Sequence, residues 1–458
     1  MAKAFTLVLS YVLQAMAIVY IAIFLASCGQ SEAPKTIAEI NQLMGKGARI
    51  PRLISLPNDE VLMSWVEPLD NGHVLKFAQY KQGKWLPVGE VARGDNWFIN
   101  WADFPSVVPI THDFWLSHRL VKQPGGKAYD YDVVLSLSND AGLTWRDIGS
   151  PHRDGSAAEH GFAAIFPEGD AAGVIWLDGR EYFDKKDAAK YPNKSGNFSL
   201  RYTRVHSDGK MEAEQVIDNN TCTCCWPSVA ATPLGAIATW RGRTNAEIRD
   251  NNISLLRDGK WTATASLGAE GWKIDGCPVN GPAVAARRLQ VVAAWFSAEG
   301  DRPRIRAAFS KDGGKSFSQP VEIDNASPLG RIGLIWKDDK TAVISWVTAA
   351  DSTGKQAGLV LRTISTSGEM SQIKRIAKIS TGRDTGVPQM AATEQGIMLA
   401  WTNAESTHGI KTAIVPWVDL TKQNFLKKMS ETWHAFAPHA LLATKPAVFL
   451  ASICTSPH

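Results

Sequence analysis

The chain has 458 residues, of which 45% are hydrophobic and 21% charged, so its composition is that of a folded protein with a sizeable core and excludes a disordered chain. Its formal net charge of +4 is the small difference between 49 basic and 45 acidic residues, too diffuse a bias to indicate a nucleic-acid partner. The 17 Trp, 37 Gly and 23 Pro favour many short strands joined by turns over long helices.

Residues 1–27 have the features of an export signal. An apolar run from Ala4 to Ala26 leads into Leu25-Ala26-Ser27-Cys28, which matches a bacterial lipobox and predicts lipidation of Cys28. A membrane-spanning anchor is the alternative, because the run is long enough to cross a bilayer. Either interpretation places the body outside the cytoplasm. A lipid-anchored protein at the outer membrane or periplasmic face of a bacterial cell envelope is expected, with residues 28–47 as a tether.

From residue 48 to residue 419 one pattern recurs: an extended start, an apolar strand ending near a tryptophan, a polar loop, another strand and a glycine-containing turn. The tryptophans at this place in the pattern lie roughly 50 to 64 residues apart: Trp65, Trp115, Trp176, Trp240, Trp295, Trp346 and Trp401. This spacing suits four-stranded blades, so the chain is predicted to be an all-β propeller of seven units. The unit around Trp115 is the least regular, which leaves six blades as the alternative. The structure of the tail, residues 420–458, stays open.

Two turns share the pattern Ser-x-Asp-x-Gly-x-Ser/Thr-aromatic: Ser138 to Trp145 and Ser310 to Phe317. The Asp carboxylate is suited to accept hydrogen bonds from the turn's own amides, and the Gly supplies a positive φ. The pattern resembles the Asp-box, or BNR repeat, of the sialidase-like β-propeller superfamily. Arg49-Ile50-Pro51 is similar to the Arg-Ile-Pro motif of the first strand in sialidases. The chain therefore resembles a lipoprotein member of that superfamily.

This resemblance implies a glycan or another anionic small ligand, with Arg49 as one of the arginines that clamp a substrate carboxylate. It also implies exo-α-sialidase-like glycosidase activity. Sialidases use a Tyr nucleophile late in the propeller, but the last Tyr here is Tyr202, so that route lacks its nucleophile. Asp103 and Glu159 are the carboxyls predicted to serve another glycosidase or lyase chemistry. A non-catalytic binding propeller is the alternative.

Equivalent positions at the start of each first strand should form a ring at one rim, because that strand lines the axis of a propeller. The ionic residues are densest in the third and fourth units. The side chains predicted to bind a polar or anionic ligand are Arg49, His160, Asp178, Arg180, Arg241, Arg243 and Asn280. Ordinary polar strand ends are the alternative explanation. A monomer that binds no nucleic acid is expected.

Four cysteines occur where neighbouring units begin: Cys222, Cys224 and Cys225 in NTCTCCWP, and Cys277 in DGCPVNGP. They are predicted to lie close in space. Outside the cytoplasm structural disulfides are the expectation. A soft-metal site for copper or zinc, with His160 joining, and redox-active thiols are the alternatives.

Overall fold

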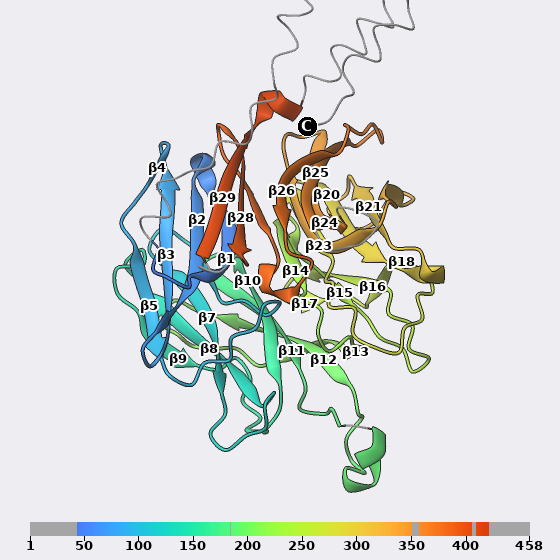
Figure 1. Cartoon of the computed structure of the whole chain (residues 1–458). Coiled ribbons are helices and arrows are strands. Elements are labelled where there is room, and N and C mark those ends of the chain that lie inside the picture. The colour runs from blue at the N-terminus through green and yellow to red at the C-terminus, as the bar shows by residue number, and fades with distance from the viewer. Residues whose placement is uncertain (1–43, 184, 350–356, 405–408, 421–458) are drawn as a thin grey trace, which may run out of the picture.

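The computed structural model describes residues 44–183, 185–349, 357–404 and 409–420, and these residues form seven antiparallel sheets arranged as a propeller (Figure 1). The prediction of an all-β propeller is confirmed, with seven blades rather than six. Within the described ranges, no helix has both the length and the apolar character needed to cross a bilayer. The predicted signal segment, Cys28 and the chain after residue 420 lie outside the described residues.

The strands of each blade follow one another outward from the axis in chain order. Blade 1 contains β1 (Arg49–Ser55), β2 (Val61–Leu69), β3 (Gly72–Lys81), β4 (Lys84–Trp85) and β5 (Gly89–Gly94). Blade 2 contains β6 (Ser106–Pro109), β7 (Trp115–Lys122), β8 (Tyr131–Ser138) and β9 (Arg146–Gly149). Blade 3 contains β10 (His160–Glu168), β11 (Ala171–Asp178), β12 (Phe198–Val205) and β13 (Gln215–Thr221). Blade 4 contains β14 (Ser228–Thr232), β15 (Gly235–Arg241), β16 (Asn251–Arg257), β17 (Lys260–Trp261) and β18 (Ala265–Gly268).

The remaining blades repeat this order. Blade 5 contains β19 (Ala283–Arg287), β20 (Gln290–Ser297), β21 (Arg304–Ser310) and β22 (Val321–Asp324). Blade 6 contains β23 (Pro328–Trp336), β24 (Thr341–Ala349), β25 (Ala357–Ser365) and β26 (Lys374–Ile379). Blade 7 contains β27 (Gln389–Ala392), β28 (Gly396–Asn403) and β29 (Gly409–Pro416). Short 3-10 turns are η2 (Pro57–Asp59), η3 (Lys185–Lys190), η4 (Glu299–Asp301), η5 (Arg383–Thr385) and η6 (Trp417–Leu420).

The ring closes where the first blade packs against the last, seen as the blue and red strands side by side in Figure 1. The Ile50 amide donates to Thr402 Oγ1 at 2.9 Å, and the Ala392 amide donates to Ser55 Oγ at 3.1 Å. Apolar side chains of both blades share one buried cluster that includes Trp65. Closure by packing and side-chain hydrogen bonds therefore joins the two ends of the described chain.

Six blades carry a buried tryptophan at one register of the second strand, which explains the periodicity of the sequence. Five of these indoles donate Nε1–H to a carboxylate at 2.7–2.9 Å: Trp65 to Glu67, Trp176 to Asp178, Trp240 to Asp218, Trp295 to Glu270 and Trp346 to Asp324. Blade 2 differs. Ser106 pairs with His118, as Ser228 pairs with Thr239 in blade 4, so Arg119 takes the place that Trp240 has there. The Arg119 guanidinium donates to Asp147 at 2.6 Å. The prediction that Trp115 belongs to this set is therefore wrong. Trp115 is the first residue of β7, four residues before the equivalent position.

The two repeated turns have the same internal hydrogen bonds. Asp140 accepts from the Thr144 amide at 2.8 Å and from its hydroxyl at 2.5 Å, and Asp312 makes the same pair of bonds with Ser316 at 3.0 and 2.6 Å. These bonds, the Thr144 hydroxyl first, lower the pKa of Asp140 to about 2. Gly142 has φ +85°, and a Cβ there would collide with Phe77. The roles predicted for Asp and Gly in this turn are thus confirmed.

Candidate functional site

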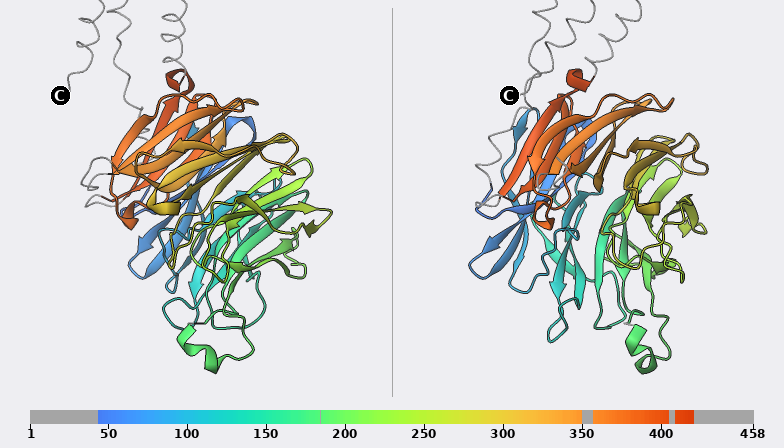
Figure 2. Two further views of the ribbon diagram at one scale, coloured as in Figure 1. Left: turned by 90° about the vertical axis from the view of Figure 1, so that its right-hand side faces the viewer. Right: turned by 45° about the vertical axis from the view of Figure 1, so that its right-hand side comes forward.

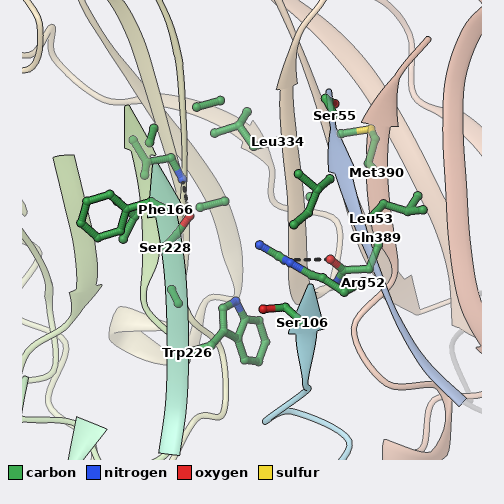
Figure 3. A pocket seen from close by; sticks show the side chains of 18 of the residues that line it. Arg52, Leu53, Ser55, Ser106, Phe166, Trp226, Ser228, Leu334, Gln389 and Met390 are labelled. Atoms are coloured by element: carbon green, nitrogen blue, oxygen red, sulfur yellow. Dashed lines mark hydrogen bonds between the residues drawn. The ribbon is translucent and has the colours of Figure 1, made fainter. Parts of the chain in front are cut away.

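The inner strands enclose a central channel with a cavity of about 540 Å³ (Figure 3). Arg52 extends into this channel and donates from Nη1 to Gln389 Oε1 at 2.8 Å. Its guanidinium also lies 5.4 Å from the centre of the Phe104 ring. Among the described residues Arg52 has no carboxylate within ion-pair distance, and burial lowers its pKa to about 10. Arg52 is therefore a cation in the channel that has no carboxylate partner in the described part of the chain.

Arg49, the residue predicted to clamp a carboxylate, lies at the rim instead. Its Nε donates to the Gly47 carbonyl at 3.3 Å, and its side chain is half-buried. Ile50 has φ +50°, and the pairing of β1 with β2 shifts register between Arg49 and Arg52. This bulge separates the two arginines, so that Arg52 enters the channel and Arg49 does not.

The end of the channel where the first strands begin is filled by the connector between blades 1 and 2. The Trp101 ring lies 5.0 Å from the guanidinium of Arg331, in β23 of blade 6. It lies 5.9 Å from that of Arg383, in η5 between blades 6 and 7. Phe104 packs near Trp226 of blade 4, with ring centroids 6.5 Å apart. The predicted ring of ligand-binding side chains therefore surrounds a packed connector and not an open channel.

Asp103 and Glu159, the predicted catalytic carboxyls, are brought together by Tyr131. The Tyr131 hydroxyl lies 2.9 Å from Asp103 Oδ2 and 3.1 Å from Glu159 Oε1. Burial raises the pKa of Asp103 to about 7, and burial with the nearby Asp103 carboxyl raises that of Glu159 to about 8. The Tyr131 hydroxyl can donate to one carboxyl only. The second contact is satisfied when the other carboxyl is protonated and donates to the phenol oxygen. Tyr131 is 0% exposed, and this cluster locks blade 2 to blade 3.

His160 stacks on His152 with ring centroids 3.7 Å apart and an interplanar angle of 6°. Its Nδ1 lies 3.2 Å from Asp132 Oδ1, and its Nε2 lies 3.4 Å from Asp154 Oδ1. Burial alone would lower the pKa of His160, but these carboxylates and Asp178 raise it to about 9. His160 is 0% exposed and lies among carboxylates of blades 2 and 3.

Asp178 and Arg180 form a two-bond ion pair beside this histidine. Arg180 donates from Nε and Nη2 to the two Asp178 oxygens at 2.7 and 2.6 Å, and also to Glu214 at 2.9 Å. Asp178 accepts a further bond from the Trp176 indole. The pKa of Asp178 lies below its usual range because these bonds and charges outweigh its burial. The pair anchors the base of the loop that follows β11.

Arg241 and Asn280 lie inside the fold. The Arg241 guanidinium donates to the carbonyls of Asn280, Arg249 and Phe296 at 2.7–3.1 Å, and its side chain is 1% exposed. Asn280 Oδ1 in turn accepts the Arg331 amide at 2.9 Å. These groups join blades 4, 5 and 6, so the structure places them in the scaffold beneath the rim.

A second hollow, of about 640 Å³, lies on the rim over blades 3 and 4, and we name it the rim pocket. Its lining is Tyr182, Phe183, Ser195, Gly196, Asn197, Asn220, Thr223, Arg243, Thr244, Asn245, Glu247, Arg249, Asp275, Gly276 and Cys277. One wall comes from residues 182–183 and 195–197, in the loop between β11 and β12. The same loop carries η3, the green coil at the bottom of Figures 1 and 2. Of the predicted ligand-binding residues, Arg243 lines this pocket.

Three charged side chains of the rim pocket, Arg243, Glu247 and Arg249, are paired with one another. Arg243 donates from Nη2 and Nε to the two Glu247 oxygens at 2.6 and 2.9 Å, and Arg249 donates to Glu247 Oε2 at 3.0 Å. The Glu247 carboxylate raises the pKa of Arg243. Arg249 also donates from Nη1 to Cys222 Sγ at 3.3 Å. The pocket floor is therefore a continuous ionic network that ends at a cysteine.

The four described cysteines, Cys222, Cys224, Cys225 and Cys277, meet at this floor. Cys224 and Cys277 form a disulfide, whereas Cys222 and Cys225 are buried thiols with their sulfurs 3.4 Å apart. The disulfide uses two of the sulfurs predicted as copper or zinc ligands. His160 belongs to a separate group with Asp132 and His152. Of the described cysteines, Cys222 and Cys225 are then the two free thiols, and two sulfurs are too few for a four-sulfur zinc site.

Sequence reasoning missed four contributors: Arg52, Tyr131, Tyr182 and Phe183. The length of the loop after Asp178 was the one available signal for the last two, because long connections in compact domains are often functional. Arg52 and Tyr131 gave no such signal, since their positions depend on a bulge and on contacts between blades.

No family model matches the chain, and no curated protein sequence matches it either. Solved structures do share its fold. A polysaccharide lyase of family PL25, an ulvan lyase, aligns at 10% identity with a TM-score of 0.50 over 83% of this chain and 98% of its own. An α-L-arabinofuranosidase from Fusarium graminearum aligns at 12% identity with a TM-score of 0.44, over 82% and 94%. The sialidase from Trypanosoma rangeli aligns at 10% and 0.43, over 79% and 61%. At these identities the likeness establishes the fold alone.

Proposed function

We propose that the chain is a glycan-binding propeller whose rim pocket takes a polar or anionic sugar. One observation carries this proposal: the pocket combines aromatic side chains with planar polar groups in about 640 Å³. Tyr182 and Phe183 both line the hollow, and Tyr182 is 40% exposed, so the pocket offers aromatic surface to a ligand. Sugars present apolar C–H faces and hydroxyl edges, and a pocket of this composition complements both.

Arg243 supplies a positive charge that is complementary to an anionic sugar. Its Nε and Nη2 are held by Glu247, which fixes the plane of the guanidinium. Among the described residues Arg243 Nη1 has no hydrogen-bond acceptor, so this donor remains for a ligand oxygen. A fixed guanidinium beside amide side chains recognises hydroxyls and carboxylates with little loss of entropy. The pocket therefore suits a uronic or sialic acid as well as a neutral sugar.

The test is calorimetric titration of the purified chain with oligosaccharides chosen from a glycan array. We expect Tyr182→Ala and Arg243→Ala each to weaken binding at least tenfold, about 1.4 kcal/mol. Arg93→Ala is the matched control, because Arg93 holds Glu90 through the same Nε and Nη2 atoms on the surface of blade 1. Binding that survives both pocket substitutions, or an array without a ligand, would refute the proposal.

Exo-glycosidase activity of the sialidase type is the second candidate, favoured by the Glu159 carboxyl. A pKa near 8 keeps that carboxyl protonated at neutral pH, as a general acid requires. Neither Glu159 nor Asp103 lines the rim pocket, which makes binding the leading function. Release of the fluorophore from aryl glycosides, including a sialoside, tests the second candidate. Turnover that Glu159→Gln abolishes would establish it, and absence of turnover on every substrate would count against it.

Membership of the sialidase-like superfamily and lipid anchoring belong to the same proposal. The Asp turns and the lipobox at Cys28 support them. In a bacterial host, Cys28→Ala should abolish metabolic labelling with a fatty acid and release the chain from the membrane fraction. Labelling that persists in this variant would refute lipidation at Cys28.

A further inference from the structure

The cysteines beneath the rim pocket form a graded set, from buried to exposed. Cys222 and Cys225 are 0% and 1% exposed, whereas Cys277 is exposed at the pocket wall. Cys222 Sγ lies 3.4 Å from Cys225 Sγ and 4.0 Å from Cys224 Sγ, so one sulfur contacts both the free thiol and the disulfide. A buried dithiol therefore lies within contact distance of a disulfide that opens toward solvent.

The surroundings of Cys222 favour its thiolate. Arg249 donates to Cys222 Sγ at 3.3 Å, and the Arg241 guanidinium adds positive charge nearby. The hydrogen bond with Cys225 and these charges, against burial, lower the pKa of Cys222 to about 6. Burial raises the pKa of Cys225 well above its usual value. At neutral pH the pair is thus one thiolate nucleophile and one thiol.

We infer that the four cysteines form an internal dithiol–disulfide relay between the core of blade 4 and the rim pocket. The Cys222 thiolate attacks Cys224 Sγ, so that a Cys222–Cys224 bond forms and Cys277 leaves as a thiolate. Cys225 then gives its proton to a departing thiolate and attacks Cys222, forming Cys222–Cys225 and releasing Cys224. One disulfide and two thiols are present before and after, so the exchange needs no external oxidant or reductant.

The relay transfers two reducing equivalents from buried sulfurs to a dithiol at the pocket wall. In that state Cys224 and Cys277 are available to an external disulfide or to a thiophilic metal ion. Thr223 Oγ1 lies 3.3 Å from Cys277 Sγ and is placed to hydrogen-bond the released thiolate. This inference does not depend on glycan binding, because it concerns sulfur chemistry at the pocket floor.

The experiment uses the full chain, folded, with the Cys224–Cys277 disulfide intact and without added reductant, treated with iodoacetamide. Alkylation is followed on Cys222, Cys224, Cys225 and Cys277, whose peptides are separate from those of Cys28 and Cys454. Trypsin leaves Cys222, Cys224 and Cys225 on one peptide and Cys277 on another, so the Cys224–Cys277 disulfide links two peptides. The relay predicts that alkylation accumulates on Cys277 and that the two peptides become unlinked. Linked peptides with alkyl groups on Cys222 and Cys225 alone would overturn it.

Three variants test the individual steps of the thiol–disulfide exchange. Cys222→Ser should keep Cys277 unalkylated, because the nucleophile is gone, whereas Cys225→Ser should label Cys277 and leave a Cys222–Cys224 bond. Arg249→Gln should slow labelling at pH 7 at least fivefold and much less at pH 9, where the thiol ionises without the guanidinium. Cys222→Ala replaces the serine variant if that one fails to fold by circular dichroism. Equal labelling of Cys277 with and without Cys222 would also refute the relay.

Discussion

Ionisable groups removed from solvent lie both at the central channel and under the rim pocket. Among the described residues, those at the rim are paired with opposite charges, whereas those at the channel are not. In the channel, burial lowers the pKa of Arg52 to about 10 and raises that of Asp103 to about 7. His118, beside them, has its pKa lowered to about 3 by burial and by Arg52. Each of these shifts favours the neutral form.

The rim shows the opposite arrangement. Glu247 is held by two arginines, Asp178 is held by Arg180, and Cys222 lies against Arg249. The pKa values of Asp178 and Cys222 are lowered, which favours their charged forms. The channel is a hollow that any propeller has at its axis, whereas the rim pocket is built by inserted loops that hold charge. Ligand chemistry is therefore expected at the rim.

The largest effect should follow from breaking the rim network. Glu247→Gln removes the one carboxylate that pairs with Arg243 and Arg249 among the described residues, and the Arg249 side chain is 7% exposed. Removing one partner of a buried ion pair costs about 3–5 kcal/mol. Urea denaturation should show a loss of this size. The control is Glu90→Gln at the exposed pair with Arg93, where a change below about 1 kcal/mol is expected.

If Glu247→Gln unfolds no more easily than that control, the rim charges do not stabilise the fold.

The second effect tests the neutral form of Asp103. Between pH 4 and 7 the unfolded carboxyl is ionised while the folded one keeps its proton, so this group makes the protein less stable as pH rises. The slope is about 1.4 kcal/mol per pH unit and levels off above pH 7. Asp103→Asn should remove this dependence on pH. The free energy of unfolding of the variant, relative to that of the wild type, should therefore rise by about 2–3 kcal/mol between pH 5 and pH 7.

Chemical denaturation at several pH values measures this gain, with Asp70→Asn in an exposed turn as the control. A difference between Asp103→Asn and wild type that is independent of pH would show that Asp103 is ionised in the folded chain.

The smallest effect is expected in the channel. Arg52 has a hydrogen bond to Gln389 and a contact with Phe104, but no described carboxylate partner. Arg52→Met keeps the packing of the side-chain stem and removes a desolvated charge, so the stability should change by less than about 1 kcal/mol. Glycan affinity should stay unchanged. A tenfold loss of affinity would move the ligand site from the rim to the channel.

The sequence by itself determined the features that depend on neighbouring residues. The tryptophan period follows from one packed register in successive blades, and the Asp turns are closed by bonds within five residues, as between Asp140 and Thr144. The predicted all-β propeller of seven blades needed no knowledge of how the blades meet. The concentration of charged residues in blades 3 and 4 predicted a ligand-binding rim there, and of the residues named for it Arg243 lines the rim pocket.

Tertiary structure decided everything that depends on segments distant in the chain. A bulge at Ile50 selects Arg52 over Arg49 for the channel, and a connector that carries Trp101 fills the ring predicted to be open. Tyr131 joins carboxyls 28 residues away on either side, and Cys224 pairs with a cysteine 53 residues later and not with its neighbours. Such contacts depend on the register and docking of whole sheets, which local patterns do not encode.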